Sequence, residues 1–178
     1  YCADPDQLLQ AERIIFPGVG AAGSAMRSLK QRGLDQALRE VIQRGTPVLG
    51  ICLGMQVSLT HSQENYTPTL NIIPGQVRRF AFDRKDLKIP HMGWNEVRVL
   101  QAHPVLAGIQ PGDEFYFVHS YFPQPISNDA VLAVTDYEGE FACAVGKDKY
   151  IGTQFHPEKS AKVGLRLLAN FAAWDGQC

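Results

Sequence analysis

The chain has 178 residues, of which 45% are hydrophobic and 20% are charged, and its formal net charge at pH 7 is −1. This length is typical of one domain with its own core, and the composition excludes a disordered tail and a collagen-like repeat. The near-zero net charge gives no electrostatic reason to expect a nucleic acid or a membrane surface as a partner. We therefore expect a single domain over residues 1–178.

The 4 cysteines, at positions 2, 52, 143 and 178, form no CxxC pair and no short-spaced framework. A disulfide scaffold and a zinc ribbon are therefore not expected, and the pattern favours a reducing compartment, the cytoplasm. No apolar run approaches the length of about 18 residues that a membrane-spanning helix requires. The sequence also indicates no bound metal and no cofactor.

In the first part of the chain, short apolar runs alternate with amphipathic stripes. Residues 13–16 and 48–51 have the pattern of strands that are buried on both faces. Apolar residues at helical spacing predict helices over 22–29 and 34–42, and a third from residue 53 to about residue 64.

After a loop at residues 65–75, the pattern changes to β-structure. The strand candidates contain Val77 and Phe80, Val97 and Val99, residues 115–118, residues 130–134 and residues 150–155. An amphipathic helix over 163–174 ends the chain. We expect an α/β fold with a mostly parallel central sheet, flanked by helices, and antiparallel additions in the second half.

The segment from Gly50 to Gly54 follows a buried strand and has a cysteine, Cys52, at its centre. This is the G-x-nucleophile-x-G layout of a nucleophile elbow, in which glycines avoid clashes at a sharp strand-to-helix turn. A helix N-terminus after Cys52 is expected to favour its thiolate. The alternative is a buried structural cysteine in a glycine-containing turn.

His156 follows a strand candidate, and Glu158 lies two positions further on. A cysteine nucleophile requires a base, and the base requires an acceptor that orients its other nitrogen. Pro157 keeps His156 out of the helical region, which leaves the Glu158 carboxylate able to approach the imidazole. We expect the Cys52 sulfur and His156 to meet through a hydrogen bond. A solvated loop histidine beside a helix-capping glutamate is the alternative.

A glycine loop with Gly18 and Gly20 lies between a strand and a helix. Its backbone N–H groups, with that of Leu53, are candidates for stabilising an oxyanion. An ordinary strand-to-helix turn is the alternative. A dinucleotide fingerprint is disfavoured even though Gly23 completes its letters, because Leu38 stands where the acidic residue is required.

Gln56 lies one helical turn after Cys52 and is therefore expected on the same face. Its amide is a candidate for binding a polar substrate over the thiolate. The alternative is a glutamine on a helix surface.

Together, GICLGMQ at 50–56 and HPE at 156–158 resemble the class I, or triad, glutamine amidotransferases. Five further motifs resemble the glutaminase subunits of imidazole glycerol phosphate synthases: PGVG at 17–20, IPG at 73–75, PHMGWN at 90–95, YFVHSY at 116–121 and HPEKS at 156–160. PHMGWN is the most discriminating of these motifs. The resemblance implies a flavodoxin-like amidotransferase fold.

The resemblance also implies an activity. Cys52 attacks the side-chain amide of glutamine, His156 transfers the proton, and Glu158 orients His156. Ammonia then passes to a (β/α)8-barrel cyclase in a heterodimer. There it serves to form imidazole glycerol phosphate and aminoimidazole carboxamide ribotide in histidine biosynthesis.

Further roles follow from the resemblance alone. The implied substrate and oxyanion positions are Gly18, Gly20, Leu53, Gln56, Glu64, Ser120 and Tyr121. The implied barrel-facing positions are Met92, Trp94, Asn95 and Lys159.

The family normally begins with a further strand and a glycine-asparagine loop, so the domain is expected to be N-terminally incomplete. Two other functions stay open. One is a stand-alone cysteine hydrolase of γ-glutamyl or peptide bonds, which does not need PHMGWN. The other is a catalytically silent scaffold subunit, for which the missing N-terminal segment is the argument.

Overall fold

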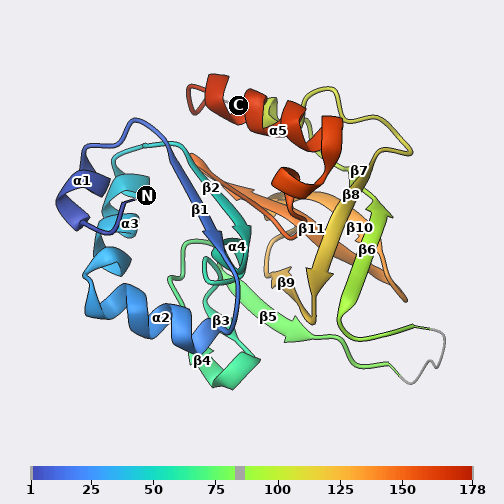
Figure 1. The fold of residues 1–178 in the computed structure, drawn as a ribbon, viewed down its shortest axis with the longest axis horizontal. Coiled ribbons are helices and arrows are strands. Elements are labelled where there is room, and N and C mark those ends of the chain that lie inside the picture. Colours follow the sequence, from blue (N-terminus) through green and yellow to red (C-terminus); the bar gives the residue numbers. More distant parts are fainter. Residues whose placement is uncertain (1, 83–86, 178) are drawn as a thin grey trace.

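A six-stranded sheet in the order β1-β2-β12-β11-β10-β7 forms the centre of the structure (Figure 1). The structure is a computed structural model that describes residues 2–82 and 87–177, so Cys178 lies outside the described residues. The strands are β1 (Ile14–Gly18), β2 (Val48–Cys52), β12 (Tyr150–Thr153), β11 (Glu140–Lys147), β10 (Val131–Asp136) and β7 (Arg98–Val99). β1, β2 and β12 are parallel, whereas β11, β10 and β7 join in antiparallel fashion. The expected α/β fold with antiparallel additions is confirmed. The expectation of a mostly parallel central sheet is wrong, because only the β1-β2 and β2-β12 pairings of this sheet are parallel and the other three are antiparallel.

Helices cover both faces of this sheet. The α-helices are α1 (Pro5–Leu9), α2 (Ala22–Gln31), α3 (Leu34–Gln43), α4 (Leu53–Gln56) and α5 (Ala161–Ala173). Short 3-10 turns are η1 (Glu64–Tyr66), η2 (Pro104–Leu106), η3 (Asn128–Ala130) and η4 (Pro157–Lys159). None of the helices within residues 2–82 and 87–177 is long and apolar enough to cross a membrane.

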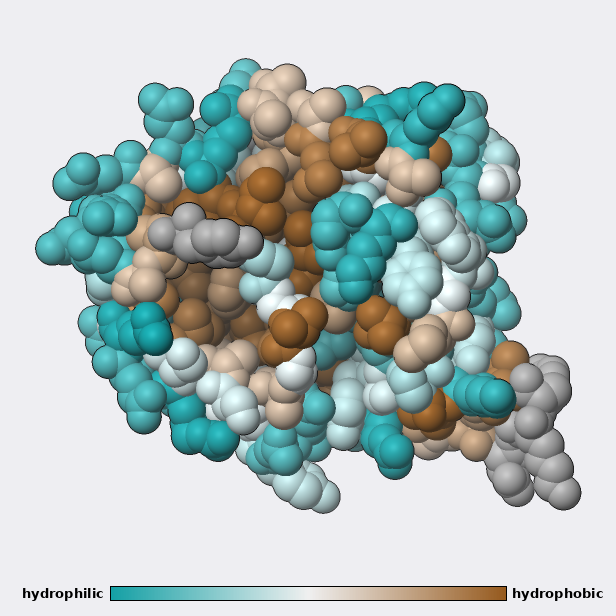
Figure 2. All heavy atoms as spheres, viewed as in Figure 1, coloured by the Kyte–Doolittle hydropathy of each residue, from teal (hydrophilic) through white to brown (hydrophobic). Residues whose placement is uncertain are grey.

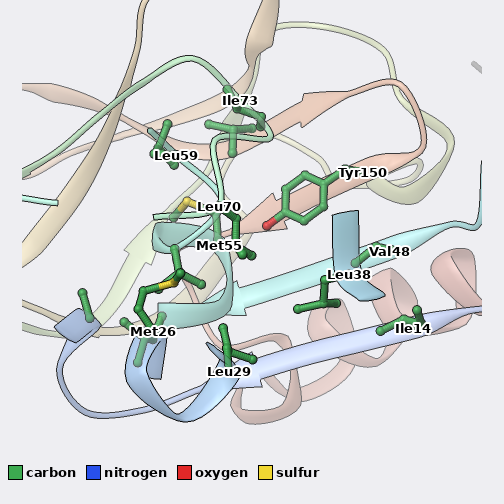
Figure 3. Close-up of a cluster of buried hydrophobic side chains, with 14 of the residues drawn as sticks. Ile14, Met26, Leu29, Leu38, Val48, Met55, Leu59, Leu70, Ile73 and Tyr150 are labelled. Atoms are coloured by element: carbon green, nitrogen blue, oxygen red, sulfur yellow. The ribbon is translucent and has the colours of Figure 1, made fainter. Parts of the chain in front are cut away.

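Strand β2 separates two hydrophobic clusters. Val48 packs with α2 and α3 residues in one cluster, part of which Figure 3 shows around Met55 and Tyr150. Leu49 and Ile51 pack with α5 residues in the other. Because successive side chains of a strand point to opposite faces, both faces of β2 are buried, as its apolar run predicts.

Two smaller sheets complete the second half. One has the order β4-β3-β5-β9, and the other pairs β6 with β8. Their strands are β3 (His61–Ser62), β4 (Thr67–Pro68), β5 (Gly75–Arg79), β9 (Tyr121–Pro125), β6 (His91–Glu96) and β8 (Glu114–His119). Sequence analysis did not identify β9, whose two prolines are atypical of strands.

The helix predicted over residues 53–64 is wrong, because α4 ends at Gln56. Beyond it, the carbonyl groups of Val57, Ser58 and Leu59 accept hydrogen bonds from the backbone N–H groups of residues 70–73. These three residues are completely buried, so the segment has no solvent-facing side on which a helix would continue. Residues 70–73 thus supply the N–H donors that a further turn of α4 would have supplied.

On the outer side of β1, the surface is hollowed and apolar. Figure 2 shows brown residues gathered in this hollow. A cavity of about 700 Å³ there is lined by apolar residues of α1, β1, α2 and α3, among them Leu8, Ile14, Phe16, Leu29 and Leu38.

The elbow glycines allow close contacts that a side chain would prevent. A Cβ at Gly54 would lie 1.8 Å from the carbonyl oxygen of Phe16 on β1. A Cβ at Gly50 would lie 2.1 Å from the hydroxyl of Tyr150, whose ring is buried in the core. The steric reason given for the two glycines is therefore confirmed.

Gly54→Ala is expected to destabilise the chain by about 3 kcal/mol or more, because backbone on an adjacent strand must move. Gly112→Ala is the matched control: its Cβ meets open space, and its φ of +88° adds only local strain, about 1–2 kcal/mol. Urea denaturation measures both values. Equal losses in the two variants would contradict the proposed clash.

Candidate active site

Cys52 is the last residue of β2 and the N-cap of α4. Its φ of 53° and ψ of −109° lie outside the regions that residues with a Cβ normally adopt. Such strain is maintained only where the surrounding structure holds it, and it concentrates at functional sites. The side chain is buried and adjoins a cavity of about 320 Å³.

The pairing of β2 with β12 brings His156 to the same cavity. The two strands run in parallel, with Ile51 opposite Thr153, so their carboxyl ends lie at one edge of the sheet. Cys52 leaves β2 at that edge, and His156 follows the end of β12. Both residues line the cavity, together with Glu64 and Lys159.

His156 and Glu158 form the expected pair. The Nδ1 atom of His156 lies 2.6 Å from Oε1 of Glu158. Since a carboxylate only accepts, Nδ1 carries a proton, and in the tautomer with its one proton on Nδ1 the Nε2 atom is an acceptor. The backbone N–H of His156 donates to Tyr116, and Ser160 donates its hydroxyl to the His156 carbonyl, which holds the loop in place.

The expected hydrogen bond between Cys52 and His156 is absent. The Nε2 atom of His156 is buried and has no hydrogen-bond partner among the described residues. A buried polar atom without a partner is unusual and requires an explanation. Catalytic hydrogen bonds are often long in the absence of substrate, so this geometry is compatible with a base that engages its partner during reaction.

Burial raises the pKa of the Cys52 thiol to about 11. The backbone N–H of Leu53 and the positive charge of Lys159 oppose this shift, while Glu158 adds to it. The N–H of Leu53 at the start of α4 does favour the thiolate, as expected, but burial has the larger effect and the net pKa is raised. The short α4 does not outweigh desolvation, and the sulfur needs a base to remove its proton.

The loop after β1 contributes Val19 and Gly20 to the cavity, and α4 contributes Leu53. Val19, Gly20 and Leu53 therefore lie around the same cavity as the Cys52 side chain. Gly18 lies elsewhere: it pairs with Cys52 in the sheet, and a Cβ on it would lie 3.1 Å from Cβ of Leu53. It supports the elbow from behind and does not line the cavity.

Gln56 is buried and lines the cavity, which excludes a glutamine on a helix surface. Its Nε2 donates to the carbonyl of Tyr121 at 2.8 Å and to Oε1 of Gln154 at 3.1 Å. Gln154 is itself completely buried, and its Nε2 lies 3.7 Å from the Cys52 sulfur. Sequence analysis missed Gln154, although a polar residue at the end of an apolar strand next to His156 is a detectable signal.

Three other predicted substrate residues line the cavity. Oε2 of Glu64 accepts from the N–H of Ala22 at 2.7 Å, which caps α2. The carbonyl of Ser120 accepts from the N–H of Phe80. The carbonyl of Tyr121 accepts from Gln56 and from His119, so both carbonyl groups are already engaged within the chain.

A buried histidine pair continues this network. Nδ1 of His119 lies 2.8 Å from the Tyr121 carbonyl and must carry a proton. Its Nε2 therefore accepts from Nδ1 of His91 at 3.1 Å, and Nε2 of His91 faces the Asn95 amide at 3.4 Å. Burial lowers the pKa of His91 to about 4 and that of His119 to about 3, so both rings are neutral at neutral pH.

The predicted partner-facing residues divide between the two faces of β6. Met92 and Trp94 are 62% and 50% exposed and point to the same side. Lys159 lies nearby, with Nζ 5.9 Å from the centre of the Tyr116 ring, against which Trp94 also packs. Asn95 points to the opposite face and donates to the Asp136 carbonyl at 2.7 Å.

Residues 4–173 match the family described as "Glutamine amidotransferase class-I". The chain belongs to this family. The Chromobacterium violaceum protein "Imidazole glycerol phosphate synthase subunit HisH" is 46% identical over 177 residues, which cover 97% of this chain and 83% of that protein. The HisH subunit of Nitratidesulfovibrio vulgaris strain DP4 is 51% identical over 176 residues, 95% of this chain and 81% of that protein. The amidotransferase therefore also belongs to the family of these subunits.

Solved structures agree with the fold of this amidotransferase. The crystal structure of a glutamine amidotransferase has a TM-score of 0.72 at 19% identity, covering 96% of this chain and 85% of that one. The glutaminase domain of Trypanosoma brucei CTPS with bound acivicin has a TM-score of 0.63 at 21% identity, covering 96% and 75%. Within residues 2–82 and 87–177, no group of three or more metal-ligating side chains is found.

The raised pKa of Cys52 predicts the pH profile of its alkylation by iodoacetamide. Because only the thiolate reacts, the rate should rise about tenfold per pH unit, without a plateau up to about pH 10. Mass spectrometry of the Cys52 peptide measures the rate, with the exposed Cys2 as a check on the reagent. A plateau near pH 8.5 or below would show that the resting site stabilises the thiolate.

The lowered pKa values of His91 and His119 predict acid sensitivity. In the unfolded chain each ring has a pKa of about 6.5, so below that pH both rings take up protons on unfolding. Their contribution to the free energy of unfolding is therefore fully present above about pH 6.5. It falls as the pH is lowered towards their folded pKa values of about 4 and about 3. Each contributes a slope of up to about 1.4 kcal/mol per pH unit. His91→Gln keeps a donor and an acceptor but not the titration, so urea denaturation between pH 4 and about 7 should show a shallower slope. An unchanged slope would contradict this assignment.

Proposed function

We propose that this chain hydrolyses glutamine to glutamate and ammonia and delivers the ammonia to a cyclase subunit. The observation that carries the proposal is the cavity shared by Cys52 and His156. The buried Nε2 atom of His156 has no hydrogen-bond partner among the described residues, and Glu158 fixes its Nδ1 atom. This arrangement supplies a nucleophile, a base and an orienting carboxylate.

In the first half of the reaction, Nε2 of His156 takes the thiol proton as the Cys52 sulfur attacks the amide carbon of glutamine. The carbonyl oxygen becomes an oxyanion, for which the N–H of Leu53 and the Val19–Gly20 loop are the candidate donors. His156 then gives its proton to the leaving nitrogen, the carbon–nitrogen bond breaks, and ammonia and a glutamyl thioester result.

In the second half, a water molecule attacks the thioester. His156 removes a proton from that water and returns it to the sulfur as the carbon–sulfur bond breaks. Glutamate leaves and the Cys52 thiol is restored. Because burial raises the pKa of Cys52, the sulfur begins as a thiol, and its proton has to move to His156 as the sulfur attacks.

The relatives are named as subunits of imidazole glycerol phosphate synthase, which supports a partner that uses the ammonia in histidine biosynthesis. We propose a (β/α)8-barrel cyclase in a heterodimer, docked on the surface made by Met92, Trp94 and Lys159. Exposed Trp and Met side chains are enriched at interface cores. Asn95 is proposed to support this surface from the opposite face of β6.

The thiols of Cys2, Cys52 and Cys143 support a reducing location, for which we propose the cytoplasm. The geometry favours low activity of the isolated chain, because Cys52 is protonated and Nε2 of His156 makes no hydrogen bond to it. A stand-alone hydrolase and a silent scaffold remain the alternatives that the following experiment separates.

Glutamate release should be slow for the chain alone and strongly stimulated by the barrel subunit. Rapid release by the chain alone would indicate a stand-alone hydrolase. Complex formation without release under either condition would indicate a scaffold. A glutamate dehydrogenase-coupled assay measures the rates.

Cys52→Ala should abolish glutamate release by the complex while cyclisation with added ammonia continues, because the sulfur acts only on glutamine. His156→Ala should lower the rate by at least about 10²–10⁴-fold, the usual contribution of a general base. Loss of ammonia-dependent cyclisation in Cys52→Ala would contradict separate sites. An unchanged rate in His156→Ala would remove this residue from the mechanism.

A further inference from the structure

Gln154 faces Cys52 across the sheet. The parallel ladder ends with the pair of Ile51 and Thr153, and the residues that follow them in the chain are Cys52, the last residue of β2, and Gln154, just after β12. The backbone N–H of Gln154 donates to the Cys143 carbonyl at 2.8 Å, which continues the pairing with β11. The backbone of Gln154 therefore lies between β2 and β11, beside Cys52, and its side chain is completely buried.

The orientation of the Gln154 amide follows from its neighbours. The Tyr121 carbonyl only accepts, so the atom of Gln56 that faces it must be the nitrogen. The second N–H of that nitrogen points to Gln154, whose near atom must therefore be the oxygen. The Gln154 nitrogen is then left facing the Cys52 sulfur at 3.7 Å.

This arrangement has two consequences for the cavity. Both N–H groups of Gln56 are used within the chain, so its Oε1 is the atom left to accept a hydrogen bond from a ligand. The Cys52 sulfur, in turn, has a neutral N–H donor directed at it from a site without solvent. A donor of this kind stabilises negative charge on sulfur relative to the neutral thiol.

We propose that Gln154 is a positioning residue that sets the amide orientation of Gln56 for substrate binding and directs an N–H group at the sulfur of Cys52. The part that concerns substrate rests on the proposed glutaminase function. The part that concerns the sulfur does not depend on it, because thiol reactivity is measured without glutamine.

Two variants of Gln154 separate these roles. Gln154→Met keeps the length of the side chain but removes both hydrogen bonds. In the complex with the barrel subunit, KM for glutamine should rise and kcat should fall, each by about two- to tenfold, the usual effect of one hydrogen bond. In the chain alone, alkylation of Cys52 at pH 9 should slow by a similar factor, about two- to tenfold.

Gln154→Glu keeps an acceptor oxygen for Gln56 and replaces the donor at the sulfur by a second oxygen. KM should stay within about twofold of the unchanged chain, since the Gln56 contact remains. Alkylation of Cys52 should slow more than in Gln154→Met, because a carboxylate beside the sulfur disfavours the thiolate.

Thr135→Val is the matched control. Thr135 lies on β10 of the same sheet, is buried, and has a hydroxyl without a hydrogen-bond partner within residues 2–82 and 87–177. Its replacement also removes a buried polar group but should leave KM, kcat and the alkylation rate unchanged. Melting temperatures of all variants report any general loss of stability.

The proposal is overturned if folded Gln154→Met retains the KM, kcat and alkylation rate of the unchanged chain. An equal rise of KM in Gln154→Met and Gln154→Glu would overturn the link to Gln56. If Gln154→Met fails to fold, Gln154→Glu decides alone: slower alkylation with KM retained supports the proposal, and unchanged alkylation overturns it. If the complex releases no glutamate, the proposed function fails, whereas the alkylation rates still test the contact with sulfur.

Discussion

The parallel pairing of β2 with β12 is the constraint on which the candidate site depends. These strands are separated by about a hundred residues of sequence, yet their register places Cys52, Gln154 and His156 at one edge of the sheet. The elbow glycines allow α4 to lie against β1 and Tyr150 to pack beneath the turn. The contacts of Gln154 with Gln56 and with the Cys52 sulfur are built on this arrangement.

Burial away from water determines which protonation states the groups of the site favour. Cys52, His156 and Gln154 are all buried, and in such surroundings a neutral group is favoured over a charged one. The thiol and the two accessory histidines, His91 and His119, accordingly have pKa values displaced toward their neutral forms. Orientation by directed hydrogen bonds therefore replaces attraction between permanent charges in most of the site.

Local patterns predicted those features that depend on local rules. The doubly buried strand ending at Cys52 and the two helices α2 and α3 follow from periodicity. The close pairing of His156 with Glu158 follows from spacing and from the proline between them. The structure confirms that Gly50 and Gly54 stand where a Cβ atom would clash with neighbouring residues, as the elbow motif predicts.

Features that depend on distant segments could not be predicted in this way. The helix after Cys52 stops because residues 70–73 take up the carbonyl groups that it would have used. Gln154 gains its role from a register between strands that no local pattern encodes. Gly18 has the right spacing for a cavity residue, but the sheet places it behind the elbow.

The carbonyl oxygen of Tyr121 joins two parts of the structure. Its oxygen has two lone pairs, and one is occupied by His119 and the other by Gln56. His119, at the end of β8, therefore connects the sheet of β6 and β8 to the same oxygen that holds Gln56. A displacement of the Tyr121 oxygen therefore changes the hydrogen bond of His119 and that of Gln56 together.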